Sequence, residues 1–176
     1  MKTIFLDKKE IQLTKDDLPM LIHGEDHAGA SFYTISLIAN LFLKGHKVIV
    51  LCGYYMAEEQ FKEQIDNLDE KLFYTKEQVS DFNKAVSIKE DINEYIFLLK
   101  NVELFNEEVI ESFLKRDKFI ISGDLNKSPF KEQILERTFK TKIYFSNIPN
   151  IEIPILNKYE GFFSSDKLKG ITNLKV

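Results

Sequence analysis

The sequence predicts an α/β fold with a mostly parallel sheet flanked by helices and a β-hairpin at the N-terminus. Three nearly continuous apolar runs, residues 47–52, 95–99 and 119–122, are typical of parallel strands that are covered on both faces. Segments with apolar residues at helical spacing separate such runs, and the connections are short. The chain has 176 residues, of which 44% are hydrophobic and 30% are charged. One domain spanning residues 1–176 is therefore expected.

The first third of the chain predicts a hairpin and then a strand–helix–strand unit. Residues 3–6 and 10–14 form short strands around a polar Asp-Lys-Lys turn. The short apolar run at residues 20–22 predicts the next strand. Residues 31–44 carry apolar side chains at helical spacing, and a glycine is placed to end that helix. The strand at residues 47–52 then completes a βαβ unit.

The rest of the chain predicts further alternating helices and strands. Helix formers dominate residues 56–65, whereas residues 66–93 mix charged and apolar positions and indicate only short helices. A helix over residues 106–116 separates the strands at 95–99 and 119–122. The remaining predicted elements are a helix over 131–139, a strand over 142–145, a turn region at 161–163 and a closing strand over 170–176.

Charge and cysteine content restrict the class of protein. With 24 basic and 28 acidic side chains, the net charge is −4, so no global attraction to nucleic acid or anionic lipid is expected. Cys52 is the only cysteine, which excludes a disulfide framework and a multi-thiolate zinc site. A charge at Asp7 comes too early for a signal peptide, and no apolar run is long enough for a membrane span. A cytoplasmic protein with no membrane partner is expected.

The junction between the strand at 20–22 and the helix at 31–44 predicts a phosphate-binding loop. The pattern G-x-x-x-x-G-K-[ST] surrounds phosphates with backbone N–H groups, neutralises them with its lysine and holds Mg²⁺ with its hydroxyl. Gly24, Gly29 and Ser31 fit this pattern, but Ala30 occupies the lysine position. The residues of the candidate loop are Gly24, Glu25, Asp26, His27, Ala28, Gly29, Ala30 and Ser31.

With this loop, the opening hairpin and the order of the later strands, the chain resembles the RecA-like ATPase superfamily, in particular the compact members related to the DnaB helicase, RadA and KaiC. The resemblance implies a water-activating glutamate after the second strand, where this chain has Tyr54 and Tyr55. It also implies a Mg²⁺-linked aspartate at the end of the next buried strand, where Lys100 follows. The strand-end Asp124 stands where relatives carry a polar sensor residue, and an N-cap or turn role is favoured for it.

Three departures at linked positions predict a pseudo-ATPase. We expect a non-catalytic RecA-like subunit with no required cofactor, which acts in assembly or regulation through self-association or a RecA-like ATPase partner. The alternative is a weak or compensated NTPase or nucleotide sensor that binds ATP with Mg²⁺, with Lys100 or another lysine supplying the missing charge, and that is linked to DNA transactions.

The histidines allow a second hypothesis, a metal or acid–base site built from His23, Asp26 and His27. Two histidines at i and i+4 align only on a helix, and Gly24 favours a loop here. A tight polar turn is therefore the preferred interpretation. Cys52, which has no basic neighbour in sequence, is expected to act as a small core residue.

Aromatic pairs in expected loops predict an interface. The pairs are Tyr54-Tyr55 and Phe162-Phe163. Aromatic side chains that are not buried often anchor contacts with a partner or an identical subunit, and they can also stack on bases. Because the chain is acidic, protein contact is favoured over nucleic acid.

Overall fold

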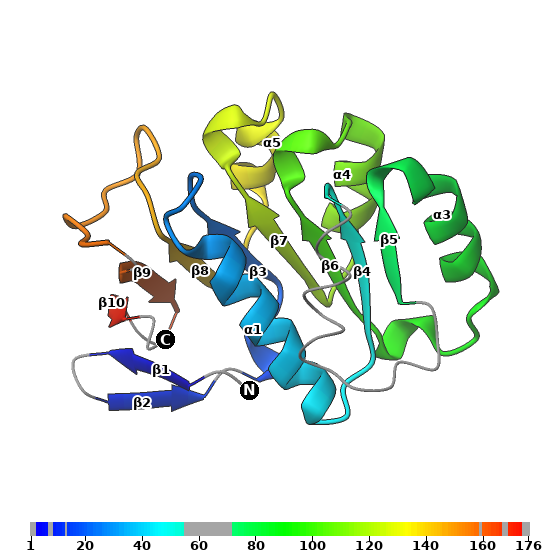
Figure 1. The fold of residues 1–176 in the computed structure, drawn as a ribbon, viewed down its shortest axis with the longest axis horizontal. Coiled ribbons are helices and arrows are strands. Elements are labelled where there is room, and N and C mark those ends of the chain that lie inside the picture. The colour runs from blue at the N-terminus through cyan, green and yellow to red at the C-terminus, as the bar shows by residue number, and fades with distance from the viewer. Residues whose placement is uncertain are drawn as a thin grey trace.

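One mixed sheet of ten strands organises the described part of the chain (Figure 1). The computed structural model describes residues 3–6, 9–12, 14–54, 72–158, 160–166 and 169–173. The strands are β1 Thr3–Leu6, β2 Lys9–Gln12, β3 Met20–His23, β4 Val48–Cys52, β5 Phe73–Thr75, β6 Ile96–Lys100, β7 Phe119–Gly123, β8 Thr141–Tyr144, β9 Glu160–Ser165 and β10 Lys169–Asn173. Their spatial order is β2-β1-β10-β9-β8-β3-β7-β6-β4-β5.

The sheet has a parallel part and an antiparallel extension. From β8 to β5, all neighbouring strands are parallel. Strands β9, β10, β1 and β2 then add on in antiparallel register. The hairpin of β1 and β2 pairs Thr3 with Gln12 and Leu6 with Lys9. The predicted α/β fold and its N-terminal hairpin are thereby confirmed.

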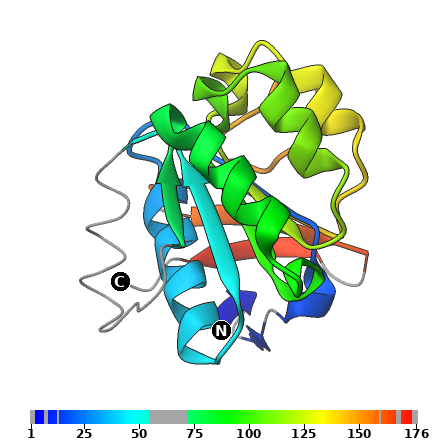
Figure 2. The same cartoon turned by 90° about the vertical axis from the view of Figure 1, so that its right-hand side faces the viewer.

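Helices cover both faces of the parallel part. Figure 2 shows α1 on one face and α3, α4 and α5 on the other. The helices are α1 Ala30–Leu43, α3 Val79–Ile88, α4 Glu107–Leu114 and α5 Lys131–Glu136, with 3₁₀ turns η1 Lys15–Asp17, η2 Lys76–Gln78, η3 Ile92–Glu94, η4 Val102–Leu104 and η5 Leu125–Lys127. Because strands β4 and β6 are covered on both faces, every residue in them is buried.

An aromatic cluster joins two helices to the sheet. Phe82 of α3 stacks on Phe113 of α4 with ring centroids 5.7 Å apart. Phe97 of β6 meets Phe113 edge-on at 6.2 Å. Offset and edge-to-face pairs of this kind add about 0.5–1.5 kcal/mol each beyond the apolar area they bury. These contacts therefore fasten α3 and α4, which lie at the right in Figure 1, to strand β6.

Most predicted elements are confirmed with small shifts at their ends. The helix predicted over 31–44 is α1, and the helix predicted over 106–116 is α4. The helix predicted over 131–139 ends earlier, at Glu136. The predicted strands at 20–22, 47–52, 95–99, 119–122, 142–145 and 170–176 correspond to β3, β4, β6, β7, β8 and β10. The predicted helix over 56–65 lies outside the described residues.

Two expectations are wrong. The turn region expected at residues 161–163 is part of strand β9, and Phe163 is only 2% exposed. Pairing with β8 and β10 on both sides places this residue inside the sheet, opposite Ile143 and Gly170. Residues 66–93, which indicated only short helices, also contain strand β5 at Phe73–Thr75. Phe163 is therefore a core residue and not an interface anchor.

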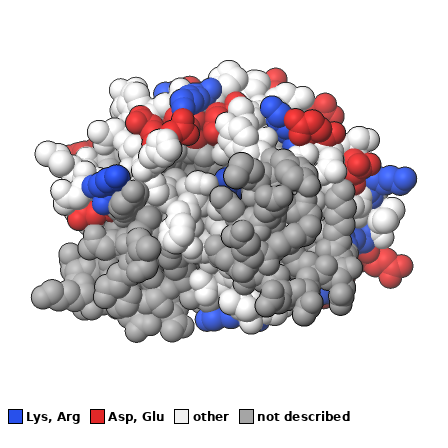
Figure 3. Space-filling model, in the orientation of Figure 1, with Lys and Arg blue, Asp and Glu red and all other residues white. Residues whose placement is uncertain are grey.

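The described helices and the charges on the face in Figure 3 were compared with what a membrane span or a basic binding face requires. Among the described residues, none of the helices has the length and apolar character required to cross a bilayer. Basic and acidic side chains alternate along the upper edge of the face shown in Figure 3. The described residues on that face do not gather into a single basic patch, which agrees with the net charge of −4.

Candidate functional site

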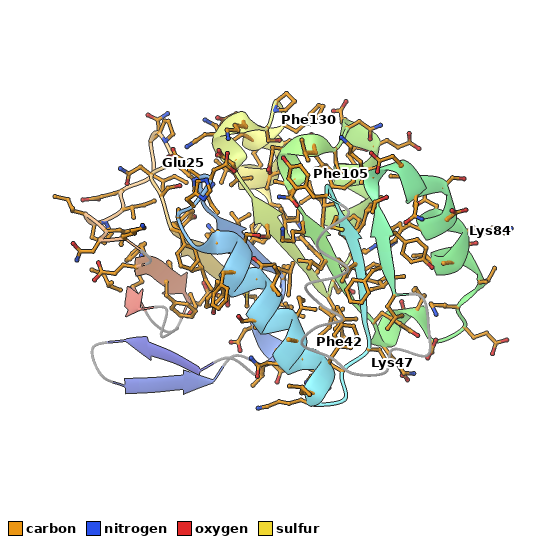
Figure 4. All side chains as sticks on the ribbon, viewed as in Figure 1. Glu25, Phe42, Lys47, Lys84, Phe105 and Phe130 are labelled. Carbon is orange, nitrogen blue, oxygen red and sulfur yellow. The ribbon has the colours of Figure 1, made fainter. Side chains whose placement is uncertain are left out.

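A cavity of about 440 Å³ opens at the carboxyl edge of the parallel strands. Strands β3, β6 and β7 end there, and helix α1 begins there. Glu25, labelled in Figure 4, marks the loop at this upper edge, whereas Lys47 lies at the opposite edge. The lining residues are Gly24, Glu25, Asp26, His27, Gly29, Ala30, Ser31, Phe32, Tyr54, Lys100, Asn101, Glu103, Ser122, Gly123 and Asp124. In open α/β sheets, ligands bind at this edge.

The loop from Gly24 to Gly29 has the strand-to-helix geometry that the sequence predicts. Strand β3 ends at His23 and α1 begins at Ala30. His27 and Gly29 have positive φ angles of 64° and 104°, which turn the chain sharply into the helix. The first intrahelical bond runs from the Tyr33 N–H to the Gly29 carbonyl. The N–H groups in the first turn of α1 therefore lie at the cavity, and no earlier helical turn supplies carbonyl groups to accept hydrogen bonds from them.

The loop requires a glycine at position 24, because the backbone there leaves no space for a side chain. A Cβ atom at Gly24 would lie 2.5 Å from the Cβ of Ala30 and 3.1 Å from that of Phe145. The Gly24 N–H also donates to the Gly123 carbonyl at 3.2 Å, which extends the ladder between β3 and β7. Close approach of the loop backbone to the first turn of α1 thus depends on this glycine.

A buried hydrogen-bond chain holds the loop to the ends of β7 and β8. His23 has no exposed surface, and its Nδ1 accepts the Leu125 N–H at 3.1 Å. The neutral ring therefore carries its proton on Nε2, which donates to Ser146 Oγ at 2.9 Å. Ser146 Oγ also accepts the Glu25 N–H at 3.0 Å. His23 thus connects three segments around the cavity.

The same tautomer excludes a serine–histidine dyad. A general base must take the hydroxyl proton, but His23 Nε2 already carries one and donates to Ser146. The metal hypothesis also fails, because both ring nitrogens of His23 are in use and Asp26 pairs with Lys127 at 2.7 Å. In the part of the chain that the structure describes, no cluster of His, Cys, Asp and Glu side chains could hold a metal ion.

The His23 chain predicts a pH-dependent stability. Burial lowers the pKa of His23 below 6.5 despite the opposing charges of Asp124 and Glu25. Below pH 6.5, His23 binds a proton in the unfolded state but stays neutral in the folded state. The free energy of unfolding should therefore fall as the pH drops from 6.5 to the pKa of His23 in the folded protein. Urea unfolding from pH 8 to pH 5 measures this slope.

The control is His23→Asn, whose amide oxygen retains an acceptor for the Leu125 N–H. This variant should lose the part of the slope that belongs to His23. An unchanged slope in His23→Asn would mean that other groups produce it.

Lys100 at the end of β6 places a positive charge beside the cavity. The residue is only 5% exposed, and its Nζ donates to Asn101 Oδ1 at 3.2 Å. Burial is the main cause that lowers the pKa of Lys100, against opposing contributions from Cys52 and Glu103. RecA-like ATPases are expected to have a Mg²⁺-linked aspartate at this position, and this chain has a buried lysine there instead.

Glu103 and Asp124 are the acidic residues that line the inner part of the cavity. Glu103 Oε2 accepts the Asp124 N–H at 3.0 Å, and burial raises the pKa of Glu103. Asp124 Oδ1 accepts the Asn126 N–H at 3.0 Å, as in an N-cap, which confirms the favoured turn role. The sequence analysis missed Glu103, because it follows a strand in a short 3₁₀ turn and no motif marks it.

The predicted interface residues differ in their positions. Tyr54 is 55% exposed at the mouth of the cavity, and Phe32 of α1, also a lining residue, is 47% exposed. Phe162 is half-buried, and Phe163 is buried as described above. Tyr55 lies outside the described residues. Only Tyr54 among these four thus stands exposed in the described structure.

Comparison with known proteins gives a likeness in structure alone. No protein-family model and no curated protein matches the sequence. The genome packaging NTPase B204 from Sulfolobus turreted icosahedral virus 2, in complex with AMPPCP, matches with a TM-score of 0.62 and 9% identity over 93% of this chain and 100% of that one.

Two longer proteins also match. The cytoplasmic domain of EssC gives a TM-score of 0.60 at 10% identity, and the pCW3 conjugation coupling protein TcpA, in its monomer form with ATPγS, gives 0.59 at 13%. Each match covers 97% of this chain, which spans 42% of the EssC chain and 64% of the TcpA chain. At these identities the matches establish the fold alone, an α/β fold like that of the packaging NTPase.

Proposed function

We propose that this chain is a non-catalytic subunit with a P-loop NTPase-like fold, which acts through assembly with itself or with an ATPase of the same fold. The single observation that carries the proposal is the buried Lys100 ammonium at the carboxyl end of β6. It stands in the cavity where the resemblance to RecA-like ATPases expects a carboxylate linked to Mg²⁺. Ala30 at the start of α1 adds the loss of the phosphate-binding lysine.

The side chains at the end of β6 oppose the binding of Mg²⁺, which ATP hydrolysis requires. Phosphoryl transfer depends on Mg²⁺ to bridge and neutralise the phosphates, and Mg²⁺ binds through oxygen ligands. Lys100 repels a cation at the end of β6. One oxygen of Glu103 and one of Asp124 already accept backbone hydrogen bonds, which leaves each carboxylate with fewer positions for a metal. The site therefore opposes the metal that hydrolysis requires while it keeps the loop and the cavity.

Assembly is supported by the mouth of the cavity. Phe32 and Tyr54 lie exposed beside it, and aromatic side chains at a cavity mouth are typical anchors of protein contacts. Two of the similar structures are named for genome packaging and for conjugation coupling. A role beside an active NTPase in the handling of DNA is the form of the proposal that agrees best with those names.

A turnover assay tests the proposal. The purified chain with ATP and Mg²⁺ should release phosphate no faster than a heat-denatured sample, because both the lysine and the metal-linked acid are missing. Ala30→Lys alone should not restore turnover, since Lys100 still opposes the metal. Robust turnover that disappears in Ser31→Ala would contradict the proposal.

The same preparations test assembly. Light scattering, with and without an added ATPase partner, should report a mass above that of the monomer, and Tyr54→Ser should reduce it. Lys84→Ser on the exposed face of α3 is the matched surface control. A monomer that captures no partner, or assembly that Tyr54→Ser leaves unchanged, would contradict this part of the proposal.

A further inference from the structure

Lys100 is a buried residue that forms no ion pair within the part of the chain that the structure describes. Only 5% of the residue is exposed. Its one hydrogen bond among the described residues goes to the neutral amide of Asn101, and no carboxylate there forms an ion pair with it. Burial of a charge is costly unless an opposite charge or several hydrogen bonds compensate it. The ammonium group therefore favours a negative partner, and no carboxylate in the described residues forms an ion pair with it.

The two inner acids do not meet this need. The carboxylate of Glu103 is directed to the Asp124 N–H, and burial raises the pKa of Glu103, which favours its neutral form. Asp124 accepts the Asn126 N–H and lies 3.5 Å from Lys127 Nζ. Each acid thus accepts a backbone hydrogen bond of its own. Glu103 acts on Lys100 through its charge but forms no ion pair with it, so Lys100 can still pair with an anion that enters the cavity.

The opposite wall of the cavity is suited to the same kind of ligand. The start of α1 at Ala30 and Ser31 lines it, after the loop from Gly24 to Gly29. Within that loop the N–H groups of Gly24, Glu25 and Ala28 already donate to protein oxygens, so the donors on this wall are those at the start of α1. Exposed backbone N–H groups at a helix start attract anions. Lys100 and the N-terminal end of α1 therefore line one cavity of about 440 Å³, a volume sufficient for a small ligand.

We propose that this cavity binds a polyphosphate chain without Mg²⁺ and that Lys100 supplies the positive charge that the metal supplies in active P-loop NTPases. This inference deepens the proposed function and rests on its loss of catalysis. Free polyphosphate carries more negative charge than its magnesium complex, so it pairs better with a fixed ammonium group. The metal in that complex would also meet Lys100 at short range and be repelled.

Calorimetric titration with ATP, in EDTA and in excess Mg²⁺, tests the inference. We expect the dissociation constant of the wild-type chain to be at least about tenfold lower in EDTA, because a buried charge-assisted hydrogen bond is gained there. Tripolyphosphate titrated in parallel shows whether the phosphates alone account for binding. An equal constant for both ligands assigns recognition to the phosphates, and tighter ATP binding adds a contact to the base.

Two substitutions at Lys100 separate its charge from its bulk. Lys100→Met should weaken binding in EDTA by about tenfold or more, and Lys100→Arg should retain it. Lys115→Met is the matched control, because it removes the same charge from an exposed side chain outside the cavity. Lys100→Met should also melt no lower than the wild type, since it removes an uncompensated buried charge.

The outcomes distinguish this inference from the proposed function. Binding that strengthens with Mg²⁺, or that Lys100→Met leaves unchanged, would overturn the role of Lys100. If neither ATP nor tripolyphosphate binds in EDTA, the role of Lys100 is also overturned. These outcomes are compatible with a chain that does not hydrolyse ATP, so they leave the proposed function standing. Phosphate release in the turnover assay would instead overturn the proposed function. The comparison of EDTA with Mg²⁺ uses the wild-type chain, so it holds even where a variant fails to fold.

Discussion

Replacement of Phe163 with Ala should lower the free energy of unfolding by about 3–5 kcal/mol, as is usual for a phenylalanine removed from a packed core. The side chain is 2% exposed in β9 and joins the buried apolar cluster of the domain. Its strand pairs on both sides, so the backbone cannot easily collapse into the space left behind. A loss of this size is a large part of the 5–15 kcal/mol that folded domains typically have.

Urea unfolding measures this effect, because the midpoint and slope give the free energy by linear extrapolation. Phe162→Ala is the matched control. It removes the same side chain from the next position on the strand, where the residue is half-buried and faces the other side of the sheet. Its cost should be clearly smaller. Equal losses in both variants, or a loss below about 1 kcal/mol for Phe163→Ala, would show that Phe163 is not a core residue.

Gly123→Ala should cost about 3 kcal/mol or more, because two penalties combine at the end of β7. Gly123 has a φ angle of 151°, which side chains rarely adopt, and such strain costs about 1–3 kcal/mol. A Cβ there would also lie 2.7 Å from the backbone nitrogen of Val102 and would meet the carboxylate of Glu103. Displacement of packed backbone adds about 1–3 kcal/mol. The variant should also move Glu103 and change the inner wall of the cavity.

Gly45→Ala is the control for the second penalty. Gly45 also has a positive φ, 78°, but a Cβ there would meet nothing within 4 Å. It should therefore show only the conformational cost, about 1–2 kcal/mol. Thermal unfolding of both variants gives the comparison. If Gly123→Ala is no more destabilised than Gly45→Ala, the contact between the ends of β6 and β7 is looser than described.

The elements that the sequence predicted well are those with a strong local pattern. The runs that became β4, β6 and β7 are apolar throughout, and α1 has apolar residues at helical spacing. These patterns depend only on neighbouring residues, so they can be read without knowledge of the fold. The phosphate-loop motif belongs to the same class, since Gly24 and Gly29 mark a turn by their own backbone preferences.

The elements that it missed depend on distant partners. Strand β9 contains a glycine and only two large apolar residues, and pairing with β8 and β10 decides its conformation. Phe163 looked like a loop residue for the same reason. Glu103 belongs to the cavity only because η4 brings it against the end of β7, where it accepts the Asp124 N–H. No sequence motif or residue spacing predicts this contact between Glu103 and Asp124.

The sequence by itself determined the α/β class, the order of most strands and helices, the loop at residues 24–31 and the absence of a lysine at Ala30, because each follows from local composition and periodicity. Only the tertiary structure decided that Lys100 is buried with no ion pair to any described carboxylate, that His23 holds the loop with a fixed tautomer, and that Phe163 lies in the core. Burial and charge compensation depend on which segments meet across the sheet. That depends on the packing of the whole domain and not on any one stretch of chain.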